Sequence, residues 1–161
     1  AVIGPGLRAT YDWRIQRAAK ADATAITDRH ALYAKSATLL PLLRDAGVTI
    51  MAGTDAGVLN SFDYPGLALH EELELFVEHG LTPLQALQSS ILAGPKFLGR
   101  ADRYGAVEAG KAADLVLLDA DPLTDIKAAR AIDGVVLHGQ WFDRAALDGM
   151  LDRARARASA K

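Results

Sequence analysis

The chain has 161 residues, half of them hydrophobic and none of them cysteine, and its formal net charge is −2. That length suffices for one domain with a core but not for a complete eight-stranded β/α barrel, which needs about 200 residues or more. The weak charge argues against a nucleic-acid partner, no apolar run approaches the ~20 residues of a membrane span, and the lack of cysteine excludes disulfides and thiolate metal sites. Localisation stays open between cytoplasm and periplasm, because the chain begins at Ala1 rather than Met.

Helices are expected before residue 47. Residues 10–25 form a polar, alanine-rich stretch, which predicts a partly exposed helix. Residues 30–46 also have leucines at helical spacing, but Pro41 must either kink this helix or begin a second short one. Gly47 then stands where glycine usually follows a helix end.

A lone carboxylate follows the next apolar segment. Residues 48–52 are short and begin with β-branched side chains, which predicts a strand, and Gly53 and Gly57 on either side of Asp55 allow a sharp turn. Asp55 is then expected at the carboxyl end of the strand, where the loops of β/α folds converge on one site. The alternative is that Asp55 only caps the following turn or helix. The spacing leaves both readings open.

The middle of the chain predicts a loop and a helix. Residues 58–66 contain Asn, Ser, Asp and Pro and are long enough to form part of a pocket rim. Residues 67–79 have apolar side chains at helical spacing, and Gly80 ends the pattern.

A second helix is predicted to start at a capping box. Thr82 is its N-cap, Pro83 occupies the first helical position, and Gln85 completes the box. Gly94 and Pro95 end or bend this helix. Its expected buried side chains, including two that pack beyond the bend, are Leu84, Leu87, Ile91, Leu92, Phe97 and Leu98.

From residue 104 the pattern changes to strands. Residues 104–108 and 113–118 predict strands on either side of a tight turn, a short helix or turn follows at 124–130, and 132–142 predict a β-hairpin. The tail at 144–161 predicts an amphipathic helix with Leu147, Met150, Leu151 and Ala154 inward. The predicted divisions of the chain are 1–103, 104–143 and 144–161.

Residues 48–145 resemble the carboxyl-terminal part of amidohydrolase-superfamily enzymes, in particular the imidazolonepropionase-like and Xaa-Pro dipeptidase-like metal-dependent hydrolases. The order and spacing of four motifs carry this resemblance. They are Ala46-Gly47-Val48-Thr49-Ile50 leading into Gly53-Thr54-Asp55-Ala56-Gly57; His70-Glu71-Glu72-Leu73 leading to Gly80-Leu81-Thr82-Pro83; Gly110-Lys111-Ala112-Ala113-Asp114-Leu115-Val116; and Asp121-Pro122-Leu123 with Val136 to Gly139.

The resemblance implies an α/β fold, the last part of a (β/α)8 metallo-hydrolase barrel with part of a small flanking β-sandwich. Asp55 matches the aspartate of the eighth strand, which in that family binds a divalent metal, here expected to be zinc, and takes a proton from the attacking water. A carboxylate suits both roles, because metal binding lowers the pKa of bound water from about 15.7 toward ~7. His70 matches a histidine near the pocket and is expected to help position the substrate.

The other metal ligands of that family are not found in the sequence. No His-x-His pair is present, and His30, His79 and His138 do not follow barrel-type strands. A metal site needs three or more protein ligands, so these residues are expected to act within a larger protein that hydrolyses C–N bonds of a small-molecule or peptide substrate. The alternative is a non-catalytic, truncated α/β module that self-associates as a homo-oligomer or pairs with a missing N-terminal barrel portion.

Overall fold

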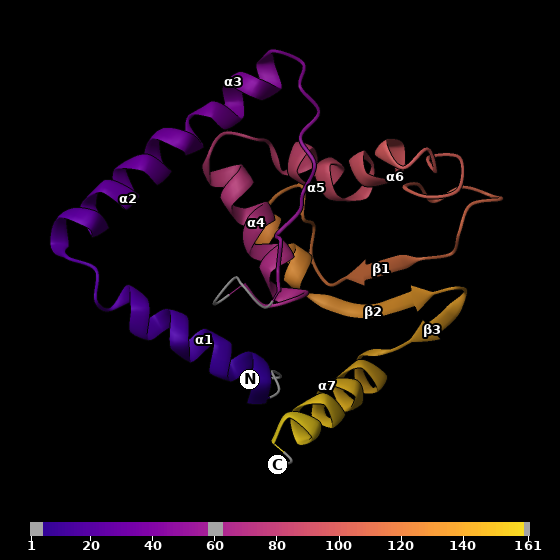
Figure 1. Ribbon diagram of the computed structural model, residues 1–161. Helices are drawn as coiled ribbons and strands as arrows, with labels where there is room; N and C mark the ends of the chain where they lie inside the picture. Colours follow the sequence, from indigo (N-terminus) through magenta and orange to yellow (C-terminus); the bar gives the residue numbers. More distant parts are fainter. Residues whose placement is uncertain (1–4, 58–62, 160–161) are drawn as a thin grey trace.

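The computed structural model describes residues 5–57 and 63–159. Three helices come first, α1 (Pro5–Ala18), α2 (Ala23–Ala37) and α3 (Leu39–Asp45). In Figure 1 they run along one side of the molecule, with α1 beside the amino terminus and α3 at the far end. Tyr11 ties α1 to the rest of the chain, since it is buried and its hydroxyl donates to the Asp63 carbonyl over 3.3 Å.

The predicted helix over 10–25 is wrong in its limits, because the chain breaks between α1 and α2. Asp22 is the N-cap of α2 and favours the start of this helix, because its side chain accepts a hydrogen bond of 2.7 Å from the Ala25 amide. Of the two alternatives for Pro41, the second short helix is confirmed, because Pro41 lies in the first turn of α3. Gly47 follows α3 with a φ of 78°, as predicted for a glycine after a helix end.

The predicted strand at residues 48–52 is not formed in the described structure. This segment leaves α3 and passes α4 and α5 as irregular chain (Figure 1). A strand needs a hydrogen-bonded neighbour, and here the Ala52 amide donates to the carbonyl of Ser89 in α5 over 3.1 Å instead. The barrel expected around this segment is therefore not part of the described architecture.

The next helices are α4 (Leu67–Glu78), α5 (Pro83–Ile91) and α6 (Ala93–Phe97). The capping box is confirmed, because the Gln85 amide donates to Thr82 Oγ1 and Gln85 Oε1 accepts from the Thr82 amide. The predicted buried stripe of α5 is confirmed only for Leu87, which is half-buried and packs against the core. Ala86 and Ser89 are the buried side chains, whereas those left exposed around α5 and α6 are Leu84, Ile91, Leu92, Phe97 and Leu98.

A three-stranded antiparallel sheet follows, with the order β1 (Leu115–Leu118), β2 (Ile132–Leu137) and β3 (Gln140–Phe142). It confirms the predicted hairpin, but residues 104–108 form bends and irregular chain rather than a strand. Val116 pairs with Val135, and Val136 pairs with Trp141. A side chain at Gly134 would overlap the ring of Trp141, which explains the glycine in this strand. The 3-10 helix η1 (Ile126–Arg130) connects β1 to β2.

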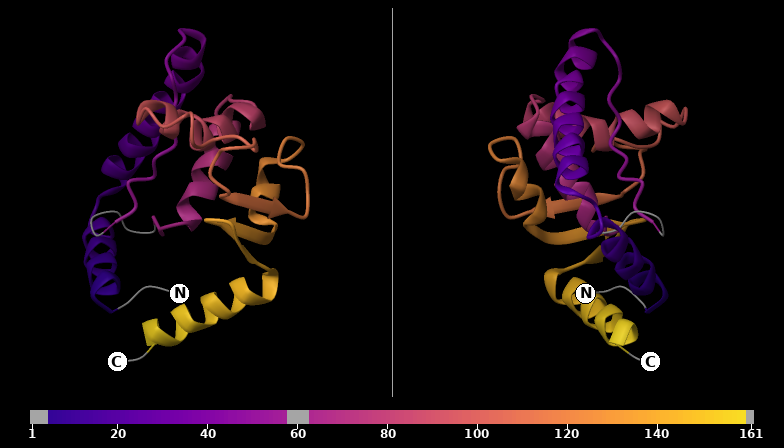
Figure 2. Two further views of the ribbon diagram at one scale, coloured as in Figure 1. Left: turned by 90° about the vertical axis from the view of Figure 1, so that its right-hand side faces the viewer. Right: turned by 60° about the vertical axis from the view of Figure 1, so that its left-hand side comes forward.

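The last helix, α7 (Arg144–Ser159), projects from the β3 side of the sheet, as both views in Figure 2 show. The sequence predicts an inward face, but α7 has no buried residue. Its start is fixed to the sheet by Arg144, whose Nη1 donates to the Ile132 carbonyl over 2.6 Å. Among the described helices, none pairs a bilayer-spanning length with the necessary apolar character.

The core is small and lies where α4, α5 and η1 meet. Leu73, Ala86 and Ile126 form its buried cluster, with Ala52 packed against it. No large side chain in the described residues is completely buried. The core therefore joins the helical part to the sheet and supports the irregular segment that leads to Asp55.

Candidate functional site

Two hydrogen bonds fasten the segment that leads to Asp55. The Ala52 amide donates to the Ser89 carbonyl of α5 over 3.1 Å, and the Gly53 amide donates to Glu72 Oε1 of α4 over 3.0 Å. Ala52 also packs on the core. The backbone is thus held from two helices immediately before the turn that carries Asp55.

Asp55 is exposed and has a φ of 52°, in the left-handed region. Aspartate tolerates this conformation better than most residues, and a non-glycine residue found there often marks a functional turn. Next to it, the Ala56 amide donates to Thr54 Oγ1 over 3.1 Å. Gly66 is the N-cap residue of helix α4. Of the predicted rim loop at 58–66, residues 58–62 lie outside the described residues.

Glu72 is the site residue that sequence reasoning missed. It is half-buried on α4, and its Oε1 accepts the Gly53 amide two residues before Asp55. The available signal was its position directly before Leu73, because a carboxylate beside a core leucine needs a partner. The partner itself lies 19 residues away in the sequence, which no local pattern reveals.

His70 lies on the same helix but is offset from Glu72 by two residues, or about 200° around the axis. It is half-buried, and its Nδ1 is buried without a hydrogen-bond partner in the part of the chain described. Burial lowers the pKa of His70, the positive charge of Arg130 lowers it further, and Glu74 opposes both. Glu74 and Arg130 form an ion pair between α4 and η1. His70 therefore shares its surroundings with η1, and its role at a substrate stays a prediction.

The environment of His70 predicts a pH-dependent stability. Since its pKa in the folded chain lies below the unfolded value of 6.5, the unfolded chain binds the proton more readily between the two values. The free energy of unfolding should therefore be highest above pH 6.5 and should fall as the pH decreases through the folded pKa. Urea unfolding followed between pH 7.5 and 5 would measure this slope.

His70→Gln should flatten that part of the pH profile, because glutamine does not titrate. The exposed His30 on α2 gives the matched control, and His30→Gln should leave the slope as it is in the unmodified chain. An unchanged slope in His70→Gln would contradict the assignment.

Two other histidines follow helix α4 and strand β2. His79 ends α4, where its Nε2 lies 2.9 Å from the Tyr33 hydroxyl, and the His138 amide in the β2–β3 turn donates to Asp114 over 2.7 Å. Within residues 5–57 and 63–159, no group of three or more His, Cys, Asp or Glu side chains could hold a metal ion. The described residues alone therefore do not fit a metal site.

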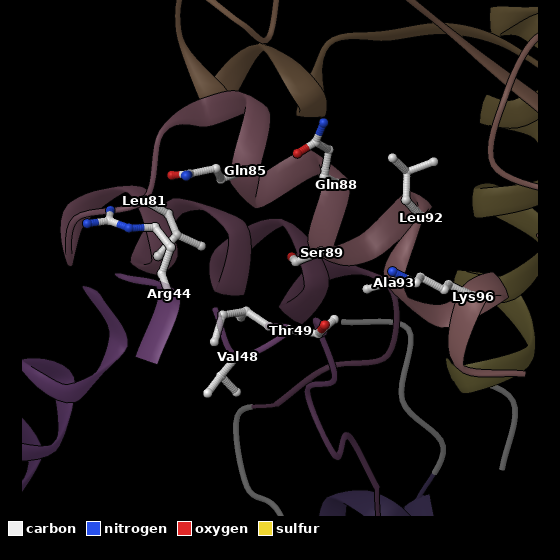
Figure 3. Close-up of a pocket in the computed structure, with 11 residues that line it drawn as sticks. Arg44, Val48, Thr49, Leu81, Gln85, Gln88, Ser89, Leu92, Ala93 and Lys96 are labelled. Carbon is white, nitrogen blue, oxygen red and sulfur yellow. The ribbon is translucent and has the colours of Figure 1, made fainter. Parts of the chain in front are cut away.

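A groove of about 330 Å³ lies beside the segment that leads to Asp55, between residues 48–50 and helices α5 and α6 (Figure 3). Val48, Leu81 and Leu92 contribute apolar walls, and Arg44 and Lys96 lie among the lining residues. Neither Asp55 nor His70 lines it. The groove is thus separate from the predicted site residues.

The model of the Amidohydrolase family matches residues 11–142. No relative among the curated proteins matches the chain. Two of the solved structures that match the chain illustrate the likeness in both sequence and fold. A Xaa-Pro dipeptidase with bound methionine in its active site has 30% identity and a TM-score of 0.57, with 66% of this chain and 25% of that one covered. Phenylurea hydrolase B has 33% identity and a TM-score of 0.57, covering 68% and 27%.

A third solved structure shows the likeness of the fold over nearly the whole chain. Bottromycin amidohydrolase has 23% identity and a TM-score of 0.78, with 99% of this chain and 35% of that one covered. In all three comparisons the chain spans only a quarter to about a third of the length of the solved structure.

Proposed function

The chain belongs to the amidohydrolase family, whose model matches residues 11–142, and from this membership we propose that the protein to which it contributes is a metal-dependent hydrolase. Its substrates are small molecules or peptides with a carbon–nitrogen bond of the amide or cyclic amide type, and its metal is zinc. The family match carries this proposal. The similar Xaa-Pro dipeptidase and phenylurea hydrolase B are themselves hydrolases by name.

Within this proposal, Asp55 is a metal ligand and the general base. Its exposure supports these roles, since the carboxylate lies at the surface of a turn that α4 and α5 hold in place. His70 contributes to substrate positioning. The remaining metal ligands come from outside the described residues, because these alone offer no group of three.

The test is hydrolysis of a panel of dipeptides and cyclic amides by the complete protein before and after removal of its metal. We expect chelation to reduce turnover at least ~100-fold and added zinc to restore it, because metal-assisted hydrolysis depends on the ion. Hydrolysis that is unaffected by a chelator, in protein shown by elemental analysis to be metal-free, would overturn the proposal.

A non-catalytic role is the second candidate, and the exposed apolar side chains favour it. Phe97 is 78% exposed and Leu98 66% exposed, although such side chains are normally covered. In this case the chain would act by self-association or by complementing another barrel portion. Zinc titration and sedimentation of the 161-residue chain test this non-catalytic role. A well-behaved monomer would contradict self-association, and a tight stoichiometric zinc site would contradict the incomplete metal site.

A further inference from the structure

We propose that Glu72 is a positioning residue that fixes the turn carrying Asp55. This inference rests on the proposed function, since the turn matters for catalysis only if Asp55 does. Its structural part, the contact between α4 and Gly53, stands independently of any activity.

The contact is a single hydrogen bond of 3.0 Å from the Gly53 amide to Glu72 Oε1. A bond to an ionised acceptor is roughly twice as strong as one between neutral groups. Residues 48–52 have no strand ladder. This bond and the one between Ala52 and Ser89 therefore hold the backbone in place, as hydrogen bonds to neighbouring strands would in a sheet. Releasing Gly53 would free the backbone two residues before Asp55.

Glu72 is held firmly on its own side of the contact. It precedes Leu73, which is 4% exposed in the core, so α4 cannot easily shift or rotate at this point. The acceptor thus belongs to a helix that is anchored in the core, whereas the turn that carries Asp55 has no buried residue among residues 53–57. This is the arrangement by which a rigid element fixes a catalytic loop.

The second oxygen of Glu72 points to a functional reason for the carboxylate. Oε2 is buried and has no hydrogen-bond partner in the part of the chain described. A buried oxygen that is not hydrogen-bonded costs stability, which an apolar side chain at this position would avoid. The carboxylate is therefore poorly explained by packing and better explained by what its other oxygen holds.

The experiment compares Glu72→Leu and Glu72→Gln in the complete protein, with Glu71→Leu as the control because Glu71 is exposed on the same helix. We expect Glu72→Leu to lower kcat by about 10–100-fold with little change in KM, since a misplacement of ~1 Å can cost 10²-fold. Glu72→Gln retains a carbonyl acceptor and should recover most of the loss. Glu71→Leu should leave kcat unchanged.

Amide hydrogen exchange at Gly53 supplies a readout that needs no activity. In the 161-residue chain, we expect this amide to exchange faster in Glu72→Leu and to remain protected in Glu72→Gln.

If Glu72→Leu does not fold, the test depends on Glu72→Gln, because a Gln variant without activity or without protection of the Gly53 amide overturns the proposal. Full kcat in a folded Glu72→Leu also overturns it. A complete protein without hydrolase activity refutes the proposed function, whereas unchanged Gly53 exchange in Glu72→Leu refutes the contact.

Discussion

Asp55→Asn lowers kcat of the complete, metal-loaded protein by about 10²–10⁴-fold if Asp55 has the roles proposed for it, the usual range for loss of a general acid or base. Asparagine has the same shape and tolerates the φ of 52° found at this position. The substitution thus removes the negative charge and the proton acceptor while the turn keeps its backbone conformation. Initial rates at saturating substrate, together with the metal content of the purified variant, measure both effects.

The metal content separates the two roles of Asp55. A variant that loses its metal shows that Asp55 is needed as a ligand, whereas a variant that keeps the metal but not turnover shows that it is needed as the base. Asp102→Asn is the matched control, since Asp102 is an exposed aspartate in the turn after α6, and it should have normal kcat. Near-normal turnover of Asp55→Asn would remove Asp55 from the mechanism.

Local signals predicted local structure well. The capping box at Thr82, the glycine after α3 and the β2–β3 hairpin each depend on residues within a few positions of one another, and each is confirmed. Such features need little from the rest of the chain, because the hydrogen bonds that define them close within one turn.

Features that depend on distant partners could not be read in this way. The apolar pattern of residues 48–52 predicts a strand, but a strand forms only against another strand. Here Ala52 bonds to α5 and the following Gly53 bonds to α4 instead. Helical spacing likewise predicts that Leu84 of α5 is buried, yet this side chain is 51% exposed and Ala86 occupies the core position. Periodicity shows which side chains are apolar, whereas the neighbouring surfaces decide which of them are covered.

The candidate site divides in the same way. Asp55 stands out in the sequence because two glycines flank it, and the structure places it on an exposed turn. Glu72 carries no comparable signal, since the role proposed for it comes from a bond to the distant Gly53. A catalytic role of Asp55 needs further metal ligands, and the described residues do not contain a group of three. Like the predicted strand at residues 48–52, the metal site therefore depends on residues far from the local sequence pattern.

Leu73→Ala should destabilise the chain by about 2–4 kcal/mol, the usual cost of removing a buried leucine side chain and leaving a cavity. Leu73 is 4% exposed and packs with Ala86 and Ile126, so this one side chain joins α4 to α5 and η1. Leu75→Ala is the matched control, because Leu75 lies on the same helix but is 41% exposed, and it should cost less than about 1 kcal/mol. Urea unfolding of both variants measures the difference. Equal losses would show that the core is not centred on α4, and the support that α4 gives to the Asp55 turn through Glu72 would then lose its structural basis.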